Sequence, residues 1–117
     1  MPSQLTGGCL CGAIRYTISA PVTGLRACHC KNCQKSSGTG STVNAVVPED
    51  SFKIIKGGTR HYDDSATQSG RTLSRHFCGT CGSPIYSHRN PRPGFVVVRA
   101  GSLDGCSTSA VRLCAIA

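Results

Sequence analysis

FCGTCGSPIY, at residues 77–86, contains two cysteines separated by two residues, each followed by a glycine. This spacing is typical of a tight turn that presents two thiolates to one metal ion. Two more dense cysteine sets occur earlier in the chain, CLC at 9–11 and CHCKNC at 28–33. Three such sets, far apart in sequence, predict a small fold that is held together by metal.

The nine cysteines among 117 residues could instead form disulfides. Their number is odd and their sets are tight, which suits chelation better than bridging. The N-terminus lacks the pattern of a signal peptide, and no apolar run is long enough to span a membrane. We therefore expect zinc, a reducing cytoplasmic setting and no membrane partner. Cys106 and Cys114 lie in a tail without a clear pattern and are expected to be free thiols.

Zinc prefers four ligands in a tetrahedron, and the spacing leaves two partitions open. In the first, an ordinary zinc ribbon leaves three cysteines unused; its ligands are Cys30, Cys33, Cys78 and Cys81. In the second, all seven clustered cysteines are used. A closed four-thiolate site then takes Cys9, Cys11, Cys78 and Cys81. A three-thiolate site takes Cys28, Cys30 and Cys33, and its open fourth position would suit a functional zinc.

His29 stands between two cysteines of the second set. Neighbouring residues of an extended chain point to opposite faces, so we expect His29 to point away from a metal held by Cys28 and Cys30.

Short alternating segments punctuated by glycine and proline predict one domain over residues 1–117, all-β and mainly antiparallel. The expected strands are 12–18, 41–47, 52–56, 59–63, 71–77, 85–87 and 95–100, with loops at 36–40 and 64–70. No long amphipathic helix is expected.

The formal charge is +8, and it stays positive with seven thiolates and two zinc ions bound. A basic chain suits an anionic partner, either nucleic acid or a small carboxylate. The basic residues are scattered and aromatic residues are not interleaved with them, so nucleic acid is the less favoured partner.

The chain contains three motifs, GGCLCGAIRY at 7–16, CHCKNCQKSSG at 28–38 and FCGTCGSPIY at 77–86, and also Gly57 and AGSLD at 100–104. Together they resemble the glutathione-dependent formaldehyde-activating enzyme family, which includes centromere protein V. The resemblance covers about residues 7–104, and residues 105–117 are atypical. It implies small stacked antiparallel sheets stapled by zinc, the β-tent fold. It also supports the second partition, with a structural four-cysteine zinc and a functional three-cysteine zinc.

The resemblance further implies a carbon–sulfur lyase that joins glutathione and formaldehyde, or a related small aldehyde, as S-hydroxymethylglutathione. A glutathione thiolate at the open zinc position would be ionised at neutral pH and held for attack. Three protein thiolates make zinc a weak Lewis acid, which disfavours a hydrolase.

Glutathione carries two carboxylates, so basic and amide groups near the cysteines are candidate ligands for it. The first candidates are Lys31, Asn32, Gln34 and Lys35. Further candidates are Arg71, Arg75 and His76, with backbone N–H groups of Ser36, Ser37 and Gly38. The alternative function is a non-catalytic zinc module that binds an anionic macromolecule. The sequence leaves the oligomeric state open.

Overall fold

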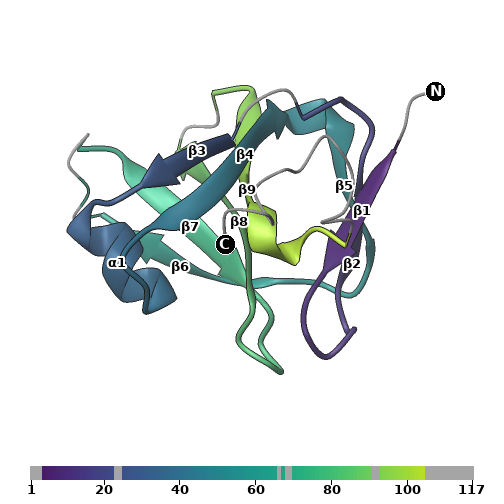
Figure 1. Cartoon of the computed structure of the whole chain (residues 1–117), viewed down its shortest axis with the longest axis horizontal. Helices are drawn as coiled ribbons and strands as arrows, with labels where there is room; N and C mark the ends of the chain where they lie inside the picture. The colour runs from purple at the N-terminus through teal and green to yellow at the C-terminus, as the bar shows by residue number, and fades with distance from the viewer. Residues whose placement is uncertain (1–3, 23–24, 66, 68–69, 91–92, 105–117) are drawn as a thin grey trace.

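The computed structural model describes residues 4–22, 25–65, 67, 70–90 and 93–104. They form two antiparallel sheets, one short α-helix and two 3-10 turns at Glu49–Ser51 and Ala100–Ser102 (Figure 1). The smaller sheet has the order β1 (Leu5–Gly8), β2 (Arg15–Ile18), β5 (Phe52–Lys56). The larger sheet has the order β3 (Leu25–Cys28), β4 (Thr42–Pro48), β9 (Phe95–Arg99), β8 (Pro84–Asn90), β7 (Thr72–Phe77), β6 (Arg60–Asp64). The prediction of a mainly antiparallel β fold is confirmed.

The apolar core joins the two sheets. Alternate residues of β2, β4 and β9 are buried because successive side chains of a strand point to opposite faces. The buried members from these strands are Tyr16, Ile18, Ala45, Val47, Val96 and Val98. The ring of Phe52, on the smaller sheet, contacts Tyr16 and Tyr86 with centroids 5.0 and 4.6 Å apart. Each large apolar side chain buried in this way stabilises the fold by roughly 1.5–3 kcal/mol.

Three short elements were not expected from the sequence. Strands β1 and β3 have four residues each, and the helix α1 (Lys31–Ser37) has seven, so none is long enough to show a clear hydrophobic period. The helix takes in Ser36 and Ser37, which were expected to begin a loop. It ends at Gly38, whose φ of 75° is the left-handed conformation that glycine adopts at low cost.

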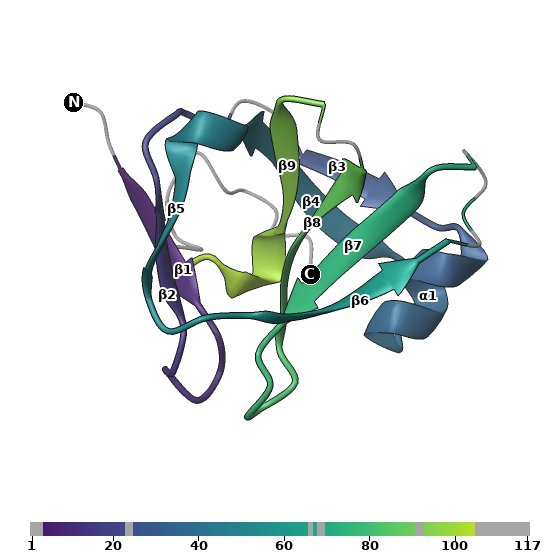
Figure 2. The same ribbon diagram turned by 180° about the vertical axis from the view of Figure 1, so that it is seen from behind.

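The cysteine sets lie at two places in this fold. The loop between β1 and β2 and the loop between β7 and β8 protrude side by side at one edge of the molecule in both views (Figures 1 and 2). Helix α1 lies away from these loops and contacts β4. Among the described residues, no helix is long and apolar enough to cross a membrane.

Candidate metal centres and the adjoining cavity

The seven clustered cysteines fall into two groups, within each of which all Sγ atoms lie within 4.8 Å of one another. The four-cysteine group contains Cys9, Cys11, Cys78 and Cys81. The three-cysteine group contains Cys28, Cys30 and Cys33. This is the grouping that the second partition expects, and Cys30 and Cys33 do not lie in one group with Cys78 and Cys81, as the ribbon partition would require. Cys106 and Cys114 lie outside the described residues.

The four-cysteine group joins the two protruding loops. The Sγ atoms of Cys9 and Cys11 are 3.7 Å apart, and those of Cys11 and Cys78 are 3.9 Å apart. A zinc–sulfur bond of about 2.3 Å places tetrahedral sulfur ligands about 3.8 Å from one another. Cys9 is 8% exposed and Cys78 only 2%. The donor set and its spacing therefore fit a closed four-thiolate zinc site.

Backbone hydrogen bonds shape the loop that carries two of these thiols. Gly82 N–H donates to the Cys78 carbonyl (2.8 Å), and Cys78 N–H donates to the Ser83 carbonyl (2.9 Å). The Ser83 hydroxyl lies 3.2 Å from Cys81 Sγ and also accepts the N–H of Leu10, so it links both loops. The Ser83 side chain and backbone lower the pKa of the Cys81 thiol. Ser83 is thus a supporting residue that the sequence patterns did not single out.

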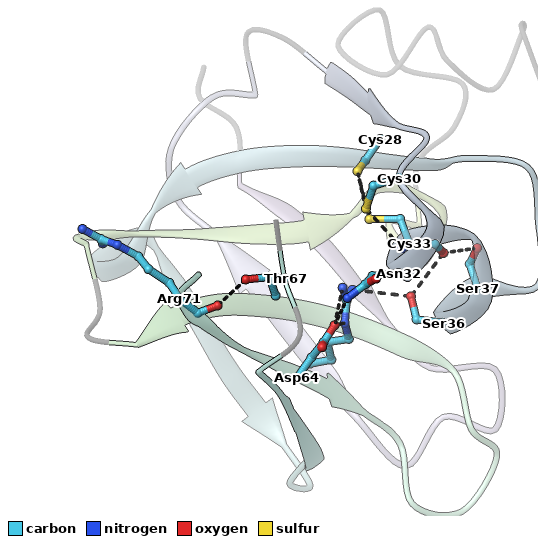
Figure 3. Close-up of polar contacts among 10 residues, drawn as sticks. Cys28, Cys30, Asn32, Cys33, Ser36, Ser37, Asp64, Thr67 and Arg71 are labelled. Carbon is cyan, nitrogen blue, oxygen red and sulfur yellow. Dashed lines mark hydrogen bonds and ion pairs between the residues drawn. The ribbon is translucent and has the colours of Figure 1, made fainter. Parts of the chain in front are cut away.

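The three-cysteine group forms where β3 meets α1 (Figure 3). Cys28 ends the strand, Cys30 is the helix N-cap and Cys33 is the buried residue of the helix. The Sγ atom of Cys28 lies 3.0 Å from that of Cys33 and 3.5 Å from that of Cys30. Three thiols so close together suit a soft, thiolate-binding metal such as zinc. His29 is exposed and lies outside this group, as its place in the sequence predicted.

Hydrogen bonds distinguish the thiols of this group. The backbone N–H of Cys33 donates to Cys30 Sγ (3.4 Å) and lowers the pKa of that thiol. The hydrogen bond with Cys33 raises the pKa of Cys28 to about 11. Without metal, the helix N-terminus therefore favours ionisation of Cys30, and the full set of thiolates requires a cation to offset its charge.

A cavity of about 290 Å³ adjoins the three-cysteine group. Its walls include the three cysteines and three basic side chains, Arg75, Arg89 and Arg99. Asn32, among the residues proposed from the sequence, also lines it. The cavity therefore brings together a cluster of thiols that could bind a metal ion and positively charged side chains.

Asp64 attaches helix α1 to the sheet beside this cavity (Figure 3). Its carboxylate accepts a hydrogen bond from the Asn32 amide (2.9 Å) and two from the Arg75 guanidinium (3.1 and 3.2 Å). The side chains of Asp64 and Arg75 are only 11% and 12% exposed. Removing either member of so buried a pair would leave the other charge buried without a partner, which costs free energy. The pair therefore holds the two side chains in one arrangement. The first turn of the helix, and with it Cys33, is held in place by this contact.

Arg99 is a cavity residue that the sequence interpretation missed. Burial lowers the pKa of its guanidinium, and the neighbouring charge of Cys33 opposes this effect. The signal was present in FVVVRA, because Val96 and Val98 face the core and the alternation places Arg99 on the opposite face with Val97.

The other candidates for glutathione contacts lie elsewhere on the helix surface. Lys31 donates to the Gln34 side chain (3.1 Å), whose amide donates to the His29 carbonyl (2.8 Å). Lys31, Gln34 and Lys35 are not among the residues that line the cavity. The hydroxyls of Ser36 and Ser37 donate to the Cys33 carbonyl.

Two further candidates lie on or near β7. Arg71 is exposed, and its carbonyl accepts a hydrogen bond from Thr67. His76 lies 3.0 Å from His88 (Nε2 to Nε2), contacts the Thr59 hydroxyl through Nδ1 (2.8 Å) and stacks on Tyr86. His88, and not His76, lines the cavity.

The described residues form a small β protein with two antiparallel sheets and two cysteine groups that could hold metal ions, one of them beside a cavity. Residues 4–113 match the family described as glutathione-dependent formaldehyde-activating enzyme, and the chain belongs to this family. The match extends past residue 104, where the resemblance was expected to end.

Individual relatives agree with this assignment. A Halomonas elongata protein, named provisionally as a glutathione-dependent formaldehyde-activating enzyme, is 29% identical over 108 residues, covering 86% of this chain and 66% of its own. A Podospora anserina protein of the same provisional name is 29% identical over 82 residues, covering 67% and 36%. The chain thus spans about a third to two thirds of the length of such relatives. A crystal structure of a Rhodobacter sphaeroides protein shares the fold, with a TM-score of 0.67, 23% identity and coverage of 86% and 88%.

Proposed function

We propose that this protein adds the thiol of glutathione to formaldehyde, or to a related small aldehyde, in the manner of a carbon–sulfur lyase running in reverse. One observation carries the proposal: a three-thiol group adjoins a cavity with basic walls. The family assignment supports the same chemistry. The chain covers only part of the length of several relatives, so its own residues must carry the activity.

Both cysteine groups are proposed to hold zinc. Cys28, Cys30 and Cys33 would hold a zinc ion with one position free of protein ligands, and this ion would keep a substrate thiol ionised at neutral pH. The four-cysteine group would hold a second zinc whose role is folding. Thiols that must stay reduced for these roles favour a reducing compartment, for which we propose the cytoplasm.

The proposed step is redox-neutral. The glutathione sulfur attacks the carbonyl carbon, a carbon–sulfur bond forms, and the carbonyl π electrons move to oxygen. That oxygen takes up the proton released by the thiol, which gives the S-hydroxymethyl adduct. The cavity would hold both reactants in contact, and such positioning contributes a large part of the rate enhancement for a two-reactant step.

Glutathione is longer than its reacting cysteine, so its outer groups need contacts as well. Arg89 and Asn32 line the cavity and are proposed for groups near the sulfur. Lys31, Gln34 and Lys35, on the helix surface, are proposed for the carboxylate of the γ-glutamyl group, which is the one farther from the sulfur.

Two-dimensional exchange NMR tests this proposal by measuring how fast free formaldehyde and glutathione interconvert with their adduct. We expect the zinc-loaded protein to increase this rate and Cys30→Ser to abolish the increase. Zinc analysis should give two ions per chain for the natural sequence and one for Cys30→Ser. No protein-dependent increase would contradict the enzymatic proposal. In that case, salt-sensitive binding to DNA would favour the alternative of a non-catalytic module for an anionic macromolecule.

A further inference from the structure

Arg99 and Asn44 are two polar residues that lie next to each other on one wall of the cavity. They are directly opposite each other in the antiparallel ladder of β4 and β9, and both line the cavity that adjoins the three-cysteine group. Side chains opposite each other on one sheet face start about 5 Å apart. The two residues can therefore contact one small ligand together.

The guanidinium of Arg99 differs from two other arginines of the fold. Arg75 is bound by Asp64, and Arg15 by Asp104. Within the described part of the chain, Arg99 has no ion pair and no side-chain hydrogen bond. A guanidinium offers five N–H donors in a planar fork that matches a carboxylate. A partly buried, unpaired guanidinium at a cavity wall is thus suited to an anion supplied from outside.

Asn44 offers a hydrogen-bond acceptor, whereas Arg99 offers donors. The residue is only 9% exposed, and its Nδ2 donates to the Thr42 hydroxyl (3.1 Å). Its Oδ1 is buried and has no hydrogen-bond partner among the described residues. Buried acceptors are nearly always paired in folded proteins, so an unpaired one at a cavity is a place for a donor that enters the cavity, either a water molecule or a group of a ligand.

We propose that Arg99 and Asn44 select thiols derived from cysteine, with the carboxylate on Arg99 and an amide N–H on Asn44. This inference rests on the proposed function, because it takes the thiol to be the substrate. It favours N-acylcysteines and peptides that end in cysteine, in which the carboxylate and the amide N–H are on the same carbon. It disfavours pantetheine-type thiols, which carry an amide but no carboxylate near the sulfur. In glutathione the cysteine carboxyl is bonded to glycine, so the carboxylate placed on Arg99 is that of glycine.

Four small thiols separate the two contacts. N-acetylcysteine carries both groups, 3-mercaptopropionate only the carboxylate, N-acetylcysteamine only the amide, and 2-mercaptoethanol neither. Binding to the zinc-loaded protein is measured by isothermal titration calorimetry, with glutathione as a fifth ligand. We expect N-acetylcysteine to bind at least about tenfold more tightly than either thiol that lacks one group, since a buried polar group left unpaired costs about that much.

Substitutions assign each contact. Arg99→Gln should abolish the preference for N-acetylcysteine over N-acetylcysteamine, and Asn44→Leu should abolish its preference over 3-mercaptopropionate. Arg60→Gln, which removes an exposed arginine outside the cavity, is the matched control and should leave both preferences unchanged. If Arg99→Gln does not fold, Arg99→Lys keeps the charge without the fork and should retain only part of the carboxylate preference.

The outcomes separate this inference from the function on which it rests. Equal affinity for all five thiols in the natural sequence would overturn the recognition pair and leave a thiol-binding protein. A failure of every thiol to bind would overturn the proposed function itself. If the preferences persist in both Arg99→Gln and Asn44→Leu, other residues recognise the thiol, and the proposed roles of Arg99 and Asn44 are wrong.

Discussion

The two cysteine groups have the same ligand chemistry but differ in what they connect. The four-cysteine group joins loops whose cysteines are 67 positions apart, Cys11 and Cys78, and two of its four members, Cys9 and Cys78, are buried. The three-cysteine group is contained in residues 28–33, at the junction of β3 with α1, and it adjoins a cavity. Closing a long loop removes more freedom from the unfolded chain than closing a short one. From this difference we expect the four-cysteine group to contribute to stability and the three-cysteine group to the proposed chemistry.

The largest expected effect is that of Cys78→Ser. Structural zinc contributes about 10–16 kcal/mol in small zinc domains, which equals or exceeds the total stability of a typical domain, about 5–15 kcal/mol. Because Cys78 is 2% exposed and joins the two loops, we expect the variant to lack a cooperative thermal transition. Circular dichroism during heating measures this.

Cys30→Ser is the matched change in the other group. We expect it to retain a cooperative transition and to lose thiol-dependent activity, because the hydrogen bonds of Cys30 within the described residues go to Cys28, Cys33 and Gln34, all nearby in sequence. An equal loss of folding in both variants would remove the distinction between the two groups.

Asp64→Asn tests how the local group is held. The substitution leaves the Arg75 guanidinium buried without a charged partner and weakens the contact to Asn32. Breaking a buried pair in this way costs about 3–5 kcal/mol, which urea unfolding measures. The variant should also have a lower zinc affinity than the natural protein at the three-cysteine group, whereas the zinc affinity of the four-cysteine group should be unchanged. Asp50→Asn, at an exposed aspartate, is the control. Stability within experimental error of the natural protein would show that Asp64 does not hold the helix.

Ser83→Ala tests the support of the long-range group. The hydroxyl contacts Cys81 Sγ and accepts the N–H of Leu10, so it orients a thiol and links the loops. Loss of such a supporting contact typically lowers metal affinity about 10- to 100-fold. Competition with a chelator should show this loss for one of the two zinc ions and not for the other. Thr80→Ala, in the same turn, should leave both affinities unchanged; a weakening of both ions by Ser83→Ala would mean that the groups are not independent.

The sequence predicted the fold class and the cysteine sets better than the details of the site. Alternation was clear in FVVVRA and STVNAVV, because one face of β9 and β4 packs in the core. Helix α1 has only seven residues, so its hydrophobic period could not be seen, and the glycine at position 38 looked like part of a loop. Spacing could not distinguish the two zinc partitions, because ligand choice depends on which loops the sheets bring together.

The cavity walls illustrate the same limit. Candidates for ligand contacts were chosen by nearness in sequence to the cysteines, yet Arg99 and Asn44 come from strands that pair only in the folded sheet. Asn32, which was chosen by that criterion, does line the cavity, and Lys31, beside it, does not. A helix turns by about 100° per residue, so nearness in sequence to the cysteines does not decide which residues of α1 face the cavity.

The smallest expected effect concerns a contact near the four-cysteine group that does not involve metal. Asp104 is bound by Arg15 and Thr6, and so ties the β1–β2 hairpin to the segment after β9. The hydrogen bond from Arg15, followed by that from Thr6, lowers the pKa of the Asp104 carboxyl. In the unfolded chain an aspartate titrates near pH ~3.9, so this contribution to stability is present above that pH and is lost as the pH falls below it. Both side chains are partly exposed, 34% for Arg15 and 45% for Asp104, which limits the contribution to less than about 1 kcal/mol.

Urea unfolding of the natural protein and of Asp104→Asn, compared at several pH values, tests this contact. We expect a small difference in the free energy of unfolding at pH 6 that shrinks as the pH is lowered toward 3. The cysteine groups are the same in both proteins, so loss of metal in acid affects both alike and cancels in the difference. Arg15→Gln in the Asp104→Asn background should have little further effect. A difference that stays constant or grows in acid would show that the hairpin is held by the four-cysteine group and the core, without help from this ion pair.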